Sequence, residues 1–290
     1  MSISASMVKE LRERTGAGMM ECKKALVDSN GDLDAAIDLL RTTGQAKAEK
    51  KAKRIAAEGR IVIKSDTKHA VILEINSETD FVANDSNFIN FAESVAEAIL
   101  DNEISDLETL NKTNLSNGTN IEMARTDLIA KIGENISIRR FDKIRQCDNM
   151  GLYTHGAKIG VIVSLSGGDE EVSKDIAMHV AASNPICIDN EGIPEEMVSR
   201  EKRIFKEQAA SSGKPPEIVE KMIEGRMSKF VNEISLLGQA FVKDPDVTVE
   251  KLVKQAGATV EGFACFEVGE GIEKKVDNFA EEVMAQARGN

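Results

Sequence analysis

Histidine and cysteine, two residue types that often bind metal ions or act as nucleophiles, are few in this sequence and lie far apart. The histidines His69, His155 and His179 fall in a predicted hairpin, a turn and a helix, and none stands in HExxH or another metal-ligating spacing. No CxxC pair, as used by many zinc and redox sites, occurs among the cysteines Cys22, Cys147, Cys187 and Cys265. The spacings therefore predict neither a metal site nor a redox centre.

Nucleotide-binding and nucleophile motifs are also missing from the sequence. It contains no Walker-type GxxxxGK[ST], no dinucleotide fingerprint and no GxSxG elbow. The segment VGEGIEKK, residues 268–275, lacks the spacing of a phosphate-binding loop, so we interpret it as a helix cap. We therefore predict a protein that is not an enzyme, has no cofactor and does not bind a nucleotide directly.

Net charge and composition argue against some classes of binding partner. The net charge of −12 argues against a dedicated nucleic-acid binder. No apolar run approaches the roughly 18 residues that a membrane span needs, and the first residues show neither a signal-peptide core nor a transit pattern. Widely spaced cysteines fit a reducing compartment. We expect a cytoplasmic protein with neither a membrane nor a nucleic-acid partner.

One basic segment departs from the acidic average. Between Gln45 and Arg60, six basic residues stand against Glu49 and Glu58. The basic residues are Lys47, Lys50, Lys51, Lys53, Arg54 and Arg60. A solvated linker helix explains such a run, and a contact with RNA is the alternative. The chain has one tyrosine and no tryptophan, which leaves few aromatic rings to stack on bases.

The elements that must position any functional surface begin with a compact helical unit, residues 1–54. Val8 and Leu11 start an apolar stripe, and a glycine turn at 16–18 interrupts it. A second and a third helix follow, and we expect Gly44 to close the third. Three short helices bury little apolar surface, so such a unit is typical of a docking head.

Two adjacent methionines open the second helix of this head. Met19 lies on the same predicted face as Cys22 and Leu26, whereas Met20 stands about 100° away from it. Both methionines therefore cannot face the same small core. Met20 either packs on a neighbouring helix or forms an adaptable interface residue beside Arg12.

From Ile61 the apolar period changes from helical to two, which predicts a β-hairpin at 61–75 with its turn at 65–68. A helix with Phe88 and Phe91 on its inner face follows the hairpin. An Asn-rich loop at 111–120, a helix at 121–132 capped by Gly133 and a strand at 136–141 complete the unit. We assign residues 55–147 to this first α+β subdomain.

The same plan recurs further along the chain. The strand residues Val71-Ile72-Leu73 align with 161–163, and the helix residues Phe91-Ala92 align with 176–177. The first copy therefore carries five extra residues between strand and helix, where Thr79, Asp80, Phe81 and Val82 sit. The second copy makes this connection with residues 166–169, a bland turn. Because polar residues surround Phe81, we expect its ring to lie in solvent.

The remaining segments complete an α+β architecture. Residues 191–236 predict an antiparallel helical hairpin with a Gly/Pro tip at 211–216. A strand at 259–268 returns to the second α+β subdomain, which comprises 148–190 and 237–271. A last helix occupies 272–290. The core thus consists of two repeated subdomains with antiparallel sheets, and helical appendages extend from it.

Several segments spell out a known family in order along the whole chain. They include LRERTGAGMMECKKAL, SETDFVAND, KIGENI, YTHGAKIGV, AMHVAAS, SGKPPEIVEKMIEGR and FEVGEGIEKK. In these segments the sequence resembles bacterial translation elongation factor Ts, a family of guanine-nucleotide exchange factors for elongation factor Tu. The resemblance implies a ubiquitin-associated (UBA)-like head, a coiled-coil dimerisation module in the helical hairpin and a C-terminal helix that contacts the partner.

The resemblance also implies which residues contact elongation factor Tu. The segment Thr79, Asp80, Phe81 and Val82 would displace the partner's Mg²⁺ indirectly, and GDP would then leave so that GTP can bind. Arg12, Met19 and Met20 match the contact surface of the head. Ile132, Gly133 and His155 match core positions that flank the intruding tip, although their ordinary roles are a helix end and a polar turn. A homodimer through the hairpin is also compatible with the resemblance.

Two functions of other classes compete with nucleotide exchange. One is a helical scaffold that recruits cytosolic partners through the head without affecting a nucleotide. The other is an RNA-associated ribosome factor that uses the basic residues 47–60.

Overall fold

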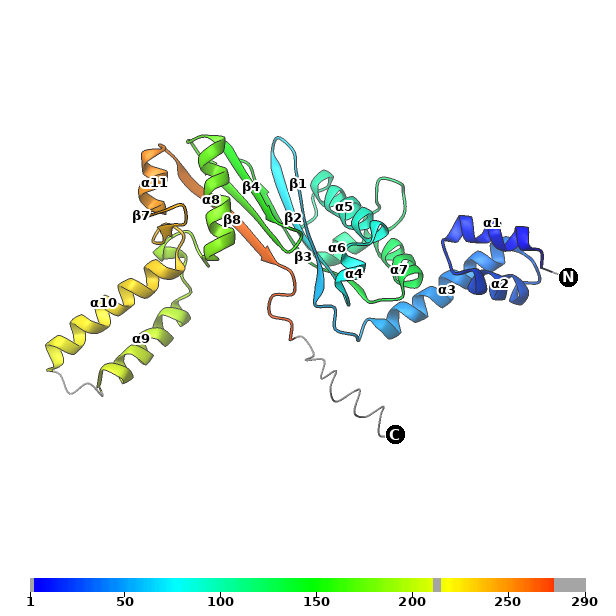
Figure 1. Cartoon of the computed structure of the whole chain (residues 1–290), viewed down its shortest axis with the longest axis horizontal. Coiled ribbons are helices and arrows are strands. Elements are labelled where there is room, and N and C mark those ends of the chain that lie inside the picture. Colours follow the sequence, from blue (N-terminus) through cyan, green and yellow to red (C-terminus); the bar gives the residue numbers. More distant parts are fainter. Residues whose placement is uncertain (1–2, 211–214, 274–290) are drawn as a thin grey trace.

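A computed structural model describes residues 3–210 and 215–273 of the chain. Figure 1 shows an elongated molecule, with a helical head at one end, a helical hairpin at the other and two β-sheets between them. The fold is α+β, as predicted. Of the predicted hairpin tip, 211–216, and the predicted last helix, 272–290, residues 211–214 and 274–290 lie outside the described residues.

Three helices form the head: α1 (Ala5–Thr15), α2 (Met19–Asp28) and α3 (Leu33–Lys51). Leu11, Cys22 and Leu26 are fully buried between them. The prediction that Gly44 ends the third helix is wrong, because α3 continues to Lys51. Gly44 is instead buried against α7 (Ile121–Ile132), where a Cβ atom would lie 3.3 Å from the Cβ of Ala130. This glycine lets two helices approach closely.

The first subdomain is a three-stranded antiparallel sheet of order β1-β2-β3 with helices on one face (Figure 1). The strands are β1 (Glu58–Ser65), β2 (His69–Ser77) and β3 (Ile136–Arg145). Helix α5 (Ser86–Asp101) packs Phe88 and Phe91 against the sheet, as the sequence predicted. The short helix α6 (Leu107–Lys112) was not predicted.

The second subdomain repeats this plan with β4 (Asn149–His155), β5 (Ile159–Ser166) and β8 (Thr259–Glu267), in the order β4-β5-β8. Helix α8 (Glu170–Ser183) covers one face of the sheet. A two-stranded ribbon, β6 (Ala240–Phe241) with β7 (Asp244–Thr248), and helix α11 (Val249–Gln255) precede β8. Neither the ribbon nor this helix was predicted from the sequence.

The central strands β2 and β5 bring the two sheets together. Val71 and Leu73 face the helices of the first subdomain, and Val161 and Val163 face those of the second. The residues between them, Ile72 and Ile162, are fully buried in one shared cluster between the sheets. The aligned residues therefore occupy equivalent places, which confirms the predicted repeat.

The connections after the central strands differ in length as predicted. Residues 78–85 join β2 to α5, whereas only residues 167–169 join β5 to α8. The five additional residues contain a one-turn helix, α4 (Asp80–Ala83).

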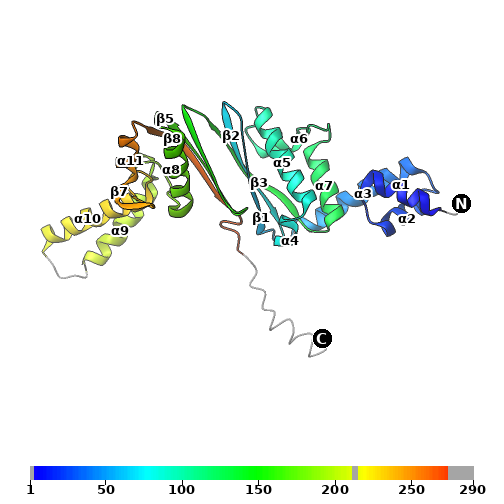
Figure 2. The same ribbon diagram turned by 45° about the horizontal axis from the view of Figure 1, so that its top comes forward.

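Two antiparallel helices, α9 (Glu195–Ala210) and α10 (Pro216–Ile234), project from the second subdomain (Figure 2). The rings of Phe205 and Phe230 meet edge to face between them, with centroids 6.5 Å apart. Leu236, which the predicted range 191–236 assigned to the hairpin, is fully buried in the core of the second subdomain. The projecting part therefore ends before Leu236.

Candidate protein-binding surface

The tip formed by α4 presents one aromatic ring to solvent. Phe81 is 85% exposed, which confirms the exposure predicted from its polar flanks. Asp80 is also exposed, whereas Val82 and Ala83 are buried in the core of the first subdomain. Val82 therefore anchors the tip to the core, although the resemblance placed it among the residues that act on the partner. The single helical turn separates an outward pair of residues from an inward pair.

Thr79, directly before α4, is fixed by a carboxylate from another part of the chain. Its backbone N–H donates to Glu134 Oε2 at 3.0 Å, and its hydroxyl donates to Glu134 Oε1 at 2.7 Å. The same hydroxyl oxygen accepts from Val82 N–H at 3.4 Å and so caps the helix. Glu134 follows Gly133, which ends α7 in a left-handed conformation (φ 91°). The predicted residues Ile132 and Gly133 thus lie next to the tip.

A second carboxylate supports the approach to the tip. Glu78 Oε1 accepts from Asn135 N–H at 2.7 Å, and Glu78 Oε2 accepts from Arg54 at 3.3 Å. The side-chain amide of Asn135 donates to the Arg54 carbonyl at 2.8 Å. At the far end of α4, Arg60 donates to the Ala83 carbonyl at 3.1 Å. Arg54 and Arg60 of the basic segment therefore form hydrogen bonds with residues at the two ends of the tip.

The head displays its two methionines. Met19 is 60% exposed and Met20 is 75% exposed. Burial of Met19 with Cys22 was predicted wrongly: the core ends at Cys22, and Met19 occupies the first position of α2, one turn beyond it. The exposure of Met20 rules out its packing on a neighbouring helix. Arg12 is also exposed, across the Gly16 turn in the last turn of α1.

Comparison with known proteins shows the family to which the chain belongs. A family model described as Elongation factor TS matches residues 78–270, which include the tip, β3 of the first sheet and the whole second three-stranded sheet. The chain belongs to the elongation factor Ts family.

Full-length relatives support the assignment. Elongation factor Ts of Thioalkalivibrio sulfidiphilus is 56% identical over 293 residues and covers 100% of both chains. The protein of the same name from Legionella pneumophila (strain Paris) is 57% identical, and that from Methylococcus capsulatus is 56% identical, each over 99% of both chains. The protein is therefore a translation elongation factor that takes part in protein biosynthesis.

Relative to this family's expected contacts, His155 lies on a different element from the tip. It is exposed at the turn between β4 and β5, and its Nδ1 lies 3.4 Å from the Tyr153 hydroxyl. The turn packs beside β1, where Ile61 N–H donates to the Ala157 carbonyl at 2.9 Å and Lys158 pairs with Glu58. The structure thus brings Thr79 together with the end of α7, and places His155 beside β1 and Met20 on the separate head.

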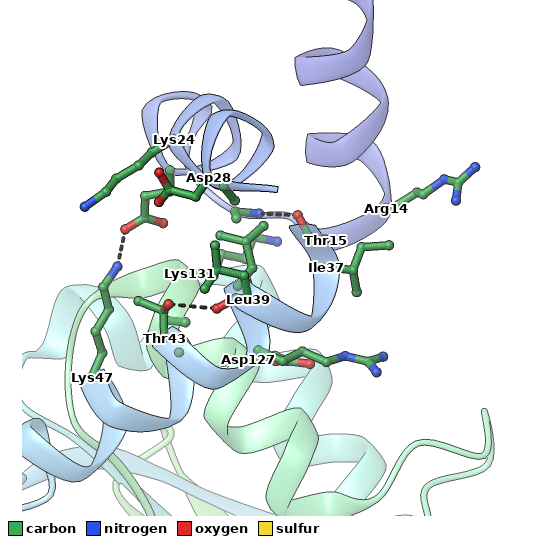
Figure 3. A pocket seen from close by; sticks show the side chains of 17 residues that line it. Arg14, Thr15, Lys24, Asp28, Ile37, Leu39, Thr43, Lys47, Asp127 and Lys131 are labelled. Carbon is green, nitrogen blue, oxygen red and sulfur yellow. Dashed lines mark hydrogen bonds and ion pairs between the residues drawn. The ribbon is translucent and has the colours of Figure 1, made fainter. Parts of the chain in front are cut away.

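A crevice of about 530 Å³ lies between the head and α7, beside the contact of Gly44 with Ala130 (Figure 3). Arg14 and Lys24 of the head and Asp127 and Lys131 of α7 line it. Burial raises the pKa of Asp127, and the charge of Arg41 opposes that shift. Mixed charges on an open crevice differ from the mostly apolar lining of a cofactor pocket. We interpret this crevice as the gap between head and core.

The buried titratable groups have structural partners. Glu74 of β2 is fully buried and accepts from Gly269 N–H at 2.8 Å, Arg139 at 2.9 Å and Arg140 at 2.6 Å. Burial by itself raises the pKa of Glu74, but these donors outweigh it and hold the pKa below its ordinary value. This network ties the segment after β8 to the first subdomain. This network was not predicted from the sequence, although the adjacent arginines in a predicted strand were a signal.

His179 of α8 is buried with both ring nitrogens engaged. Its Nδ1 accepts from Val242 N–H at 3.1 Å, which places the ring proton on Nε2, 2.9 Å from Gln239 Oε1. Burial lowers the pKa of His179, against the opposing hydrogen bond with Gln239. The neutral ring therefore fastens the β6–β7 ribbon to α8.

Within residues 3–210 and 215–273, no group of three or more His, Cys, Asp or Glu side chains is arranged to hold a metal ion. None of the helices that the structure describes is both long and apolar enough to cross a membrane.

Proposed function

We propose that this protein binds elongation factor Tu in its GDP form and acts as its guanine-nucleotide exchange factor, not as an enzyme. The observation that carries the proposal is the exposed ring of Phe81 on a tip that the second copy of the fold lacks. A large apolar side chain on an otherwise polar protrusion is typical of a protein-binding site. Family membership supplies the identity of the partner.

The mechanism requires no reactive group on this chain. In a GTPase, backbone amides of the phosphate loop and Mg²⁺ hold the nucleotide phosphates. A protein that binds best to the nucleotide-free GTPase weakens nucleotide binding by the same factor by which the nucleotide weakens its own binding. Phe81 and Asp80 would disturb the Mg²⁺ and phosphate site, GDP would leave, and GTP would displace the exchange factor.

In this mechanism the head and the tip have different roles. Arg12, Met19 and Met20 would grip the partner from the head, while α4 would distort the phosphate site. Ile132 and Gly133 would flank the tip, and His155 would contact the partner from the second subdomain. The separation of the head from the tip in Figure 1 suits a partner that is held at two places.

The basic segment does not favour the RNA-binding alternative. Lys47 pairs with Glu21, Arg54 with Glu78, and Arg60 with the Ala83 carbonyl. These contacts within the protein account for half of the six basic residues.

The decisive experiment loads elongation factor Tu with fluorescent GDP and follows its release in excess unlabelled GDP. We expect release to accelerate with increasing concentration of this protein and to saturate. An unchanged release rate despite complex formation would favour the scaffold function. An unchanged rate together with salt-dependent RNA binding would favour the ribosome-associated function.

A further inference from the structure

We infer that Glu134 and Arg60 are positioning residues that hold the two ends of α4 and so fix the direction in which Phe81 points. The effect on nucleotide exchange rests on the proposed function. The fixed geometry of the tip can be tested without it.

A four-residue helix cannot hold its shape alone. Forming a single helical turn fixes several backbone torsions for one hydrogen bond, and the first N–H groups of a helix lack partners within it. Here the Thr79 hydroxyl oxygen accepts a hydrogen bond from Val82 N–H, and the hydroxyl donates its own hydrogen bond to Glu134 Oε1. Hydrogen bonds to a carboxylate are shorter and stronger than neutral ones. Glu134 therefore holds the beginning of α4 through Thr79.

The end of α4 is held by different groups. Arg60 Nη1 donates to the Ala83 carbonyl at 3.1 Å, and the Asn84 side chain donates to the Asp80 carbonyl at 2.9 Å. Carbonyls in the last turn of a helix lack partners within it, and a guanidinium also suits that end electrostatically. Because Val82 and Ala83 are buried below, rotation of the turn is blocked on three sides. Phe81 is left as the outward side chain.

The repeated fold shows that the subdomain itself does not need this support. The second copy joins its central strand to its helix with residues 167–169 and no intervening helical turn. The Glu134 and Arg60 contacts therefore serve the inserted tip. A flexible tip would lose conformational entropy on binding, and a preformed tip avoids that cost. Glu134 is thus a positioning residue that does not need to touch the partner.

The test replaces Glu134 by Gln, which keeps its size but removes the charge and one oxygen acceptor. Glu122→Gln is the matched control, because Glu122 is a carboxylate at the other end of α7 that pairs with Arg125. Arg60→Met tests the other end of α4. The first readout is hydrogen exchange of the amides of residues 82–85, whose acceptors lie within the tip. We expect about tenfold faster exchange in Glu134→Gln than in the control.

The second readout is stimulated GDP release from elongation factor Tu, measured in both the Phe81 and the Phe81→Ala backgrounds. Glu134→Gln should slow release about three- to tenfold when Phe81 is present and much less when it is absent, because only the weaker contribution of Asp80 then remains to be misplaced. Equal slowing in both backgrounds, or unchanged hydrogen exchange at the tip, would overturn the inference. If hydrogen exchange at the tip is faster in Glu134→Gln but the wild-type protein does not stimulate GDP release, the fixed geometry of the tip is upheld and the proposed function is rejected instead.

Discussion

Thr79 and Glu134, 55 positions apart in the sequence, are joined by two hydrogen bonds that connect the end of α7 to the exposed tip. This pair explains why the segments SETDFVAND and KIGENI lie together in space. The first carries the exposed ring, and the second supplies the carboxylate that holds its base. A substitution that moves Glu134 at the end of α7 should therefore change the orientation of Phe81.

The head should supply affinity. Met20→Asp places a charge on a methionine that is 75% exposed, so folding should not change, but an apolar contact with the partner should weaken by about 1–3 kcal/mol. Titration of elongation factor Tu should show a higher apparent Kd and a nearly normal maximal GDP release rate. Thr42→Asp, which adds a charge at an exposed position of α3, is the control. A lost maximal rate with unchanged Kd would contradict this role.

The helical hairpin should be separable from the core. Residues 186–188 run beside 234–237, with Leu236 N–H donating to the Cys187 carbonyl at 2.9 Å, so a short linker can replace α9 and α10. We expect deletion of 195–234 to leave one cooperative melting transition and measurable nucleotide exchange. A deletion that also removes Leu236 should destabilise the core by about 2–5 kcal/mol. Loss of the transition in the shorter deletion would show that the hairpin belongs to the core.

The predicted dimerisation through the hairpin is tested by light scattering on the full-length protein and on the protein that lacks 195–234.

His179 should make the second subdomain sensitive to mild acid. Its folded pKa is lowered, so between that pKa and about 6.5 the unfolded state binds more protons, and stability rises with pH. The free energy of unfolding should therefore fall as the pH drops below about 6.5, by at most about 1.4 kcal/mol per unit. Urea titrations at several pH values measure it. A variant with His69→Gln and His155→Gln should retain the dependence, and its disappearance there would refute the assignment.

Ionised Glu74 should stabilise the fold, and this stabilisation should be lost only in more acidic solution than that of His179. Its folded pKa lies below the ordinary value, so its contribution is complete above about pH 4.3 and is lost as the pH falls through the folded pKa. Glu74→Gln should cost about 2–4 kcal/mol at pH 7, because Arg139 and Arg140 lose their charged acceptor. As the pH falls from about 4.3 through the lowered folded pKa of Glu74, the difference in stability between the variant and the wild type should shrink. Parallel acid-unfolding curves would exclude this role for Glu74.

The repeat could be predicted because β-strand alternation and helix periodicity repeat at Val71-Ile72-Leu73 and 161–163. The exposed Phe81 could also be predicted, since the length difference between the copies isolates it. The continuation of α3 past Gly44 could not, because a glycine that ends a helix and a glycine that admits a neighbouring helix look alike without Ala130 beside it. For the same reason Glu134 was missed: its role depends on a contact across 55 residues.

The most direct test of the account compares folding and function for Phe81→Ala. The ring is 85% exposed, so the melting temperature should barely change, whereas truncating a core phenylalanine costs about 3–5 kcal/mol. Stimulated GDP release should slow by about one to two decades, as expected if an interface anchor of roughly 2–4 kcal/mol is lost in the transition state. Asp80→Ala should act in the same direction but more weakly. Met123→Ala, at an exposed apolar residue near the opposite end of α7, should leave both quantities unchanged. An unchanged melting temperature with strongly slowed release is the predicted result. A large drop in melting temperature with release unimpaired per folded molecule would contradict the account.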